Sequence, residues 1–201
     1  MGKQGIVILL VFGIAATALA DATVYDNEAD FLVAIEGGGG FLLEDFDGYV
    51  YGGFTGYTLQ LGPQDGYAGL ISCDPSSDYL WSGDGNMSTQ SATSKLHVDF
   101  NGEPTYSTAG WFFPTDISGY YMAGEGIDIE LSNGFEYHFD PPNGTTFRGF
   151  VADDPFDWVK IDAPYTSSPA WPTMDHYYID SPEPASLSLL ALGALALLRR
   201  R

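Results

Sequence analysis

The sequence has little positive charge and a single cysteine. Its 201 residues hold seven Lys and Arg against 27 Asp and Glu, a net charge of −20. A nucleic-acid-binding surface needs clustered basic side chains, so this balance argues against that class and against attachment to an anionic membrane surface. Cys73 has no partner for an intramolecular disulfide, and we expect it to be a small buried apolar residue.

The motifs of common hydrolases and metal enzymes are also missing. There is no His-Glu-x-x-His, no Gly-x-Ser-x-Gly, no glycine-rich phosphate loop and no Cys-x-x-Cys. The three histidines, His97, His138 and His176, do not pair at metal-ligand spacing. We expect them to be solvated surface residues, which disfavours a histidine-based hydrolase or a zinc site.

The N-terminus is typical of a secretory signal peptide. Lys3 gives a positive start, residues 6–16 are apolar, and Ala18 and Ala20 are the small residues expected before a cleavage site. We therefore expect signal peptidase to remove residues 1–20. The alternative is a retained N-terminal anchor, but the apolar stretch is short for a membrane span of about 20 residues.

The C-terminus combines a proline-rich triplet, an apolar run and a basic end. The triplet and the basic end are Pro182, Glu183 and Pro184, and Arg199, Arg200 and Arg201. Residues 185–198 between them would form a hydrophobic helix of about 21 Å, against a hydrocarbon core of about 30 Å. This predicts a transient membrane association, with the arginines on the cytoplasmic side.

This order of features resembles the PEP-CTERM sorting signal of Gram-negative-type bacteria, which is also labelled the ice-binding protein C-terminal domain. The resemblance covers Pro182 to Arg201, about a tenth of the chain, and we assign residues 181–201 to this C-terminal segment. It implies recognition by an exosortase, a membrane enzyme similar to a transpeptidase, and removal of the tail near the triplet. The product would be exported to the cell envelope, the cell surface or an extracellular matrix. An ordinary tail anchor, the alternative, explains the apolar run and the arginines but not the triplet.

Between these ends, residues 21–180 have the length of one domain. Asn27 can cap a brief helix in which Phe31, Leu32 and Ile35 fall at helical spacing. Beyond it, apolar and polar residues alternate in short runs typical of half-buried strands. We expect such strands at 22–25, 57–61, 67–72, 96–100, 109–113, 127–131, 135–139, 156–162 and 174–180.

Turn signals separate these runs. Pro-Pro-Asn-Gly at 141–144 predicts a hairpin to a strand over 145–151, and the Ser-, Gly- and Thr-rich residues 81–94 predict a long surface loop. Together these features predict an all-β fold, an antiparallel, jelly-roll-like β-sandwich with one short N-terminal helix. Residues 27–31, 43–48, 147–151 and 178–180 also resemble parts of PEP-CTERM ectodomains. That resemblance implies a sandwich similar to carbohydrate-binding modules or lectins.

The many acidic side chains between the two end segments favour the binding of divalent cations. Residues 21–180 hold three strong bases against 26 acids, a net charge of −23. Two turns, Asp45-x-Asp47-Gly48 and the Gly-Asp-Gly-Asn of residues 83–86, offer oxygen ligands for calcium. The resemblance to carbohydrate modules implies a calcium that joins early and late strands, with Glu44, Asp47 and Asp180 as its ligands. Ordinary surface acids are the alternative.

Aromatic side chains in Gly- and Pro-rich segments suggest glycan binding, because flat rings stack on sugar faces. The candidates are Trp81, Trp171, Tyr51 and Tyr79, with Tyr57, Tyr120 and Tyr121 in similar segments. The alternative is that these rings cap the ends of the core.

From these features we expect an exported, non-enzymatic protein of the cell surface or extracellular matrix. Its role would be structural or adhesive, with polysaccharide as a possible partner and calcium as a possible cofactor. The alternative is a secreted, glycoside hydrolase-like enzyme on the same scaffold. Carboxylate pairs such as Asp128/Glu130 and Glu136/Asp140 are too frequent here to identify a catalytic pair. A purely structural protein without a ligand is the third possibility.

Overall fold

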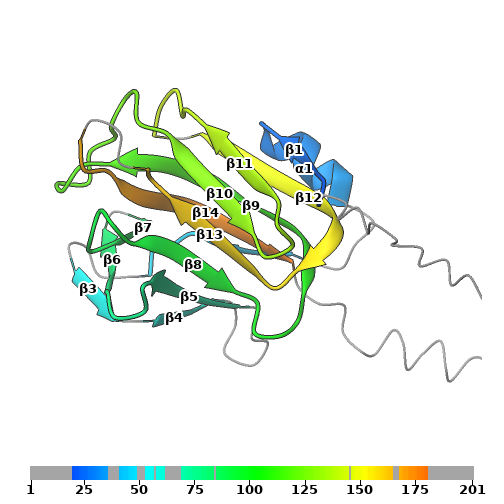
Figure 1. Cartoon of the computed structure of the whole chain (residues 1–201), viewed down its shortest axis with the longest axis horizontal. Helices are drawn as coiled ribbons and strands as arrows, with labels where there is room; N and C mark the ends of the chain where they lie inside the picture. The colour runs from blue at the N-terminus through cyan, green and yellow to red at the C-terminus, as the bar shows by residue number, and fades with distance from the viewer. Residues whose placement is uncertain are drawn as a thin grey trace, which may run out of the picture.

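Figure 1 shows the computed structural model of the chain, which describes residues 20–35, 41–48, 53–56, 58–61, 69–83, 85–144, 146–164 and 168–180. The described part contains one helix, α1 (Glu28–Ile35), and fourteen strands. The strands are β1 (Ala22–Tyr25), β2 (Phe41–Glu44), β3 (Gly53–Gly56), β4 (Thr58–Leu61), β5 (Gly69–Asp74), β6 (Leu80–Gly83), β7 (Asn86–Thr89), β8 (Lys95–Asp99), β9 (Thr105–Thr115), β10 (Ile127–Leu131), β11 (Glu136–Phe139), β12 (Phe147–Phe156), β13 (Trp158–Asp162) and β14 (Trp171–Asp180).

The strands form two antiparallel sheets that pack face to face. The eight-stranded sheet has the order β1-β12-β9-β14-β7-β6-β3, and β2 also pairs with β14. The six-stranded sheet has the order β11-β10-β13-β8-β5-β4. The predicted all-β sandwich with one short N-terminal helix is therefore confirmed. The two predicted terminal helices lie outside the described residues, and no helix within the described ranges is long and apolar enough to cross a membrane.

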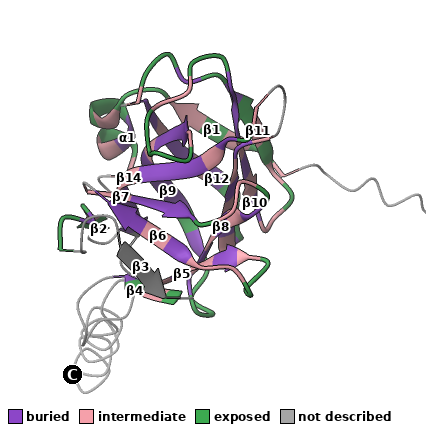
Figure 2. Cartoon of the chain, turned by 90° about the vertical axis from the view of Figure 1, so that its left-hand side faces the viewer, coloured by how far each residue is buried: buried purple, intermediate pink, exposed green. Residues whose placement is uncertain are grey.

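Side chains at every second position of the strands fill the space between the sheets. In β8 and β10 the apolar residues are buried and the polar residues between them point away from the core. They meet apolar residues of the other sheet, such as Phe112 and Met174, in one continuous cluster. Figure 2 shows the same division, with buried purple segments along β9 and β14 and exposed green turns at the ends. Cys73 is 1% exposed in this cluster, as expected.

Strand β14 crosses the middle of the eight-stranded sheet and changes partner halfway along one edge. It pairs with β9 along one side, while its other side pairs with β7 over Thr173–Asp175 and with β2 over Tyr177–Asp180. His176 lies between the two halves, at a β-bulge and with φ 47°. An extra residue in this conformation bends a strand, so the bulge separates the two partners of β14.

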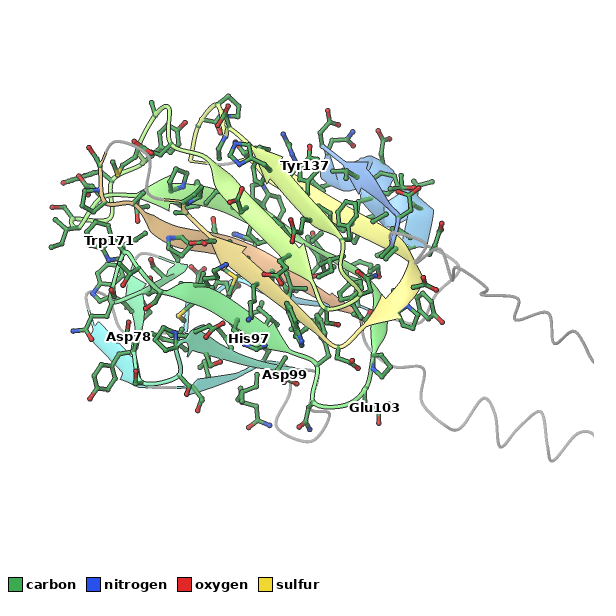
Figure 3. All side chains as sticks on the ribbon, in the orientation of Figure 1. Asp78, His97, Asp99, Glu103, Tyr137 and Trp171 are labelled. Carbon is green, nitrogen blue, oxygen red and sulfur yellow. The ribbon has the colours of Figure 1, made fainter. Side chains whose placement is uncertain are left out.

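The start of β1 and the end of β14 lie at the same end of the eight-stranded sheet. Val24 pairs with Phe150, Phe150 with Thr108, and Thr108 with Ile179, so these four residues lie in one row across the sheet. Trp171, at the start of β14, pairs with Thr115 at the opposite end. Residues 21 and 180 are therefore close to one pole of the sandwich, and Trp171 lies at the other, on the left in Figure 3.

Helix α1 lies on the outer face of the eight-stranded sheet. The side-chain oxygen of Asn27 accepts a hydrogen bond from the Asp30 N–H at 2.9 Å, which caps the helix as predicted. Phe31 is 1% exposed and packs against the rings of Phe147 and Tyr178. The helix fits closely because Gly149 lies beneath it: a Cβ there would be 2.5 Å from Phe31 Cδ2.

The predicted hairpin across residues 141–144 is wrong. β11 belongs to the six-stranded sheet, and β12 pairs with β1 and β9 in the other. Phe150 of β12 packs across the core against Phe135 and Tyr137, with ring centroids 6.2 and 5.7 Å apart. The turn therefore leads the chain from one sheet to the other. The reason is that β12 packs its apolar face across the core against β11 and does not pair with β11 in the same sheet.

The predicted surface loop over residues 81–94 is also wrong, because it contains the antiparallel pair β6–β7. Met87 is fully buried. The buried Ser88 hydroxyl donates to the Pro172 carbonyl at 2.9 Å, and Thr89 donates to the Ser91 carbonyl at 2.8 Å. Polar residues can occupy a buried strand where each hydroxyl has a partner, so composition alone was misleading.

Candidate functional site

Two of the predicted sugar-stacking residues line one hollow at the pole opposite residues 21 and 180. Trp81 of β6 and Trp171 of β14 are half-buried there, with Gln90, Asp116 and Ile117 along the rim. The hollow, called here the tryptophan hollow, has a volume of about 280 Å³. The two residues are far apart in the sequence, and the β14–β7–β6 pairing brings them together.

Both indoles are held in place by their surroundings. A Cβ at Gly83 would be 2.6 Å from Cη2 of Trp81, so the indole lies along β6 over a residue without a side chain. The Trp171 indole N–H donates to the Gln90 carbonyl at 3.1 Å. Restrained rings suit stacking, because little side-chain entropy remains to be lost on binding.

A closed turn forms the rim beside Trp81. Oδ1 of Asp116 accepts hydrogen bonds from the backbone N–H groups of Ser118 at 2.8 Å and Tyr120 at 3.0 Å. The turn leaves Ile117 83% exposed and Tyr120 73% exposed. Large apolar side chains this exposed are candidates for ligand contact.

The hydroxyl groups of the tryptophan hollow are engaged within the protein. Thr115 and Thr173 share a hydrogen bond of 2.8 Å between their hydroxyls, and Ser88 and Thr89 donate to backbone carbonyls. Asp116 is the single carboxylate among the described residues that line the hollow. The surface offered to a ligand is therefore mainly aromatic and aliphatic, with the Gln90 side chain as an exposed amide.

The other predicted aromatic residues do not join this hollow. Tyr79 is half-buried, and its carbonyl accepts from the Gln90 N–H at 2.9 Å and from Cys73 Sγ at 3.2 Å. Burial raises the pKa of the Cys73 thiol to about 12. Tyr51 and Tyr57 lie outside the described residues. Ile117 was not anticipated from the sequence, where an isolated apolar residue in an Asp-x-Ser-Gly turn is the only signal.

The three predicted calcium ligands lie on β2, in the turn after it and at the end of β14. Glu44 of β2 pairs with Tyr177, whereas Asp180 of β14 pairs with Phe41, so the two acids are at opposite ends of the β2–β14 pair. Burial raises the pKa of Glu44, and its Oε1 accepts from the Phe46 N–H at 3.2 Å. Among the described residues no three His, Cys, Asp or Glu side chains are grouped as a metal site. The side chain of Asp180 is outside the described part, and calcium stays a prediction.

The two acidic turns, by contrast, lie side by side. Oδ1 of Asp47 would be 2.9 Å from a Cβ on Gly85, and the Asp45 carbonyl oxygen 3.7 Å from it. Asn86 pairs with Asp175, whose pKa is raised by burial and, more weakly, by the charge of Asp47. Oxygens of the first turn therefore lie next to Gly85 of the second, although the sequence separates the two turns by almost forty residues.

A second concave region lies on the outer face of the six-stranded sheet. This groove, of about 390 Å³, is lined by charged residues of β8, β10, β11 and β13. Lys95 is ion-paired with Asp162 at 3.3 Å, and Lys160 with Asp74 at 2.7 Å. Glu130 lies directly opposite Glu136 in the register. This face thus gathers both lysines of the body, each with a carboxylate partner.

The histidines are more varied than predicted. His138 is exposed, and its pKa is raised most by the hydrogen bond that it donates to Asp128, and further by the charges of Asp128 and Asp140. His97, labelled in Figure 3, is half-buried on β8, and its ring packs against that of Trp158 with centroids 5.6 Å apart. Burial lowers the pKa of His97 most, followed by the charge of Lys160. His176 packs against Trp111 at 5.2 Å. Of the three, His138 fits the expectation of a solvated side chain.

Comparisons with protein-family models, with curated proteins and with solved structures found no match to this chain. The geometry of the site is therefore the basis for any functional assignment. The residues that it brings together are two restrained indoles and an apolar rim at one pole of an acidic β-sandwich.

Proposed function

We propose that this chain is an exported adhesive protein of the cell surface or extracellular matrix that binds glycan through the tryptophan hollow. The observation that carries the proposal is the meeting of Trp81 and Trp171 at the pole opposite residues 21 and 180. A sugar ring has one apolar face that stacks on an aromatic ring, and an aromatic hollow of this kind is a usual carbohydrate contact.

The two ends of the chain complete the proposal. Signal peptidase would remove residues 1–20, and an exosortase would recognise the Pro-Glu-Pro of residues 182–184 in a Gram-negative-type bacterium. Residues 21 and 180, from which these segments continue, share one pole. While the C-terminal segment associates with the membrane, the opposite pole would face outwards, towards a polysaccharide.

The test is a glycan-array screen of residues 21–180, which contain every described strand and α1, with calcium and with chelator. Trp171→Ala is the decisive variant, and Trp111→Ala, a half-buried tryptophan away from the hollow, is its matched control. We expect array signals that Trp171→Ala abolishes and Trp111→Ala retains. Silence of the wild-type protein under both conditions would leave a structural protein without a glycan ligand.

One observation favours the enzymatic alternative. Glu130 and Glu136 face each other across neighbouring strands in the groove of the six-stranded sheet. Directly opposed residues have Cβ atoms about 4.5–5.5 Å apart, which can place two carboxylates at the separation of about 5–5.5 Å used by retaining glycosidases. Release of reducing sugar ends from polysaccharide, abolished by Glu130→Gln, would favour a glycoside hydrolase over a binding protein.

A further inference from the structure

The tryptophan hollow has a neighbour on the other side of Trp81. A second hollow of about 170 Å³, called here the tyrosine hollow, is lined by Trp81, Asn86, Ser118 and Tyr120. Trp81, Thr115 and Gly119 line both hollows. Three aromatic residues therefore follow one another at this pole, with Trp171 in one hollow, Tyr120 in the other and Trp81 common to both.

We infer that the two hollows are consecutive subsites for a linear, uncharged glycan chain, with Trp81 at the boundary between them. The inference rests on the proposed glycan binding and adds the class of glycan. Each hollow is smaller than the roughly 300–1,000 Å³ of a typical small-molecule site, whereas the two together fall within that range. A single sugar would occupy one hollow, and a chain of linked sugars would use both.

The charge of the site selects an uncharged chain. Lys95 and Lys160 are ion-paired on the outer face of the other sheet. Arg148 lies over the Phe139 ring at 4.6 Å and donates to the Phe147 carbonyl. The described residues that line the two hollows thus include Asp116 but no cation. A uronate or sulfated chain would meet no counter-charge and would be repelled by the acidic body.

Gly83 is the positioning residue of this site. The Trp81 indole lies over it, and its Cβ position is 2.6 Å from Trp81 Cη2, a distance that an alanine cannot keep. On the other side, a Cβ on Gly119 would be 3.9 Å from the same atom of Trp81. Gly83 also lines the tyrosine hollow, and Gly83→Ala would move the shared ring out of both subsites.

The experiment measures calorimetric affinities of residues 21–180 for oligosaccharides of one to six units from neutral glucan, mannan, xylan and galactan series. Oligogalacturonate of the same lengths is the anionic probe. We expect affinity for the neutral ligand to rise from one unit to several and then level off, with at least tenfold weaker binding of oligogalacturonate. The affinities should be the same in buffer with calcium and in buffer with chelator, unless the turns after β2 and before β7 bind calcium.

Variants separate the two subsites. Trp171→Ala and Tyr120→Ala should each weaken binding of the longer chains about three- to tenfold, the size of one aromatic contact. Tyr106→Ala is the control, because Tyr106 is 53% exposed on β9 but lines neither hollow. Trp81→Ala should remove the dependence on length, and Gly83→Ala should do the same. Combining these two should cost no more affinity than Trp81→Ala alone.

The outcomes of these experiments separate the two-subsite inference from the proposed glycan binding on which it rests. Equal affinity for one unit and six units, with Tyr120→Ala unchanged, would overturn the two-subsite arrangement but keep glycan binding. Oligogalacturonate binding as tightly as the neutral chains would overturn the selection by charge. Failure of every series to bind the wild-type protein would overturn both the inference and the proposed function. A Gly83→Ala variant with full affinity would remove the positioning role.

Discussion

Replacing Phe31 with alanine should detach helix α1 from the sandwich. The helix has eight residues, and Phe31 is its only fully buried side chain among those described. Isolated helices shorter than about 12–15 residues are marginal in water, so α1 depends on its packing. The ring of Phe31 lies 6.1, 5.9 and 6.2 Å from the rings of Tyr25, Phe147 and Tyr178.

The expected loss follows from burial of this ring. Phe→Ala substitutions in cores cost about 3–5 kcal/mol, depending on how far the site can collapse. The cluster around Phe31 is small and covered by a single helix, which can move towards the sheet. We therefore expect about 3 kcal/mol, which corresponds to a melting temperature lowered by about 6–12 °C for a domain of this size.

Urea unfolding of residues 21–180, followed by circular dichroism, measures this loss. Val33→Ala is the control on the same helix, because Val33 is 67% exposed and its truncation should cost less than about 0.5 kcal/mol. No residue of α1 lines the tryptophan hollow, so glycan affinity should be unchanged in both variants. A loss below about 1 kcal/mol for Phe31→Ala would refute the argument that this ring holds the helix.

Three other predictions concern pH, calcium and processing. The pKa of His97 is lowered in the fold, so the unfolded chain binds its proton more readily, and stability should fall as the pH drops below about 6.5 towards the folded-state pKa. In urea titrations from about pH 8 to pH 5, His97→Gln should lose this dependence, and a pH-independent difference from wild type would contradict it. If calcium binds, a chelator should lower the melting temperature by the linkage of binding to folding, and Asp47→Ala should blunt that response. Replacing residues 182–184 by alanines should leave uncleaved protein in the membrane, and unchanged processing would remove the sorting proposal.

The sequence was sufficient to predict the strands whose burial alternates. Residues 127–131 show apolar and polar side chains in strict turn, and β10 has the corresponding buried and half-buried pattern. The Asn27 cap was equally readable, because the capping hydrogen bond is local. Features that are set by residues close together in the chain could therefore be predicted from the sequence.

Features that are set by contacts between residues far apart in the chain could not be predicted from the sequence. The polar strand β7 is stable because Ser88 reaches the carbonyl of Pro172, 84 residues away. The choice between a hairpin and a crossing to the other sheet after β11 depends on where Phe150 is buried. The candidate site follows the same rule: Trp81 and Trp171 could each be nominated by their glycine- and proline-rich surroundings, but their meeting is set by the strand order β14-β7-β6.

Trp171 and Asp180 are the two ends of one strand, β14, which extends over about 30 Å. If a glycan is held at the first and the tail leaves from the second, tension between them acts along the axis of β14. The backbone hydrogen bonds to β9, β7 and β2 lie across that axis, so the load is shared among them in shear rather than breaking them one after another. Such a strand would resist extension without a covalent cross-link, in keeping with a body that holds one cysteine.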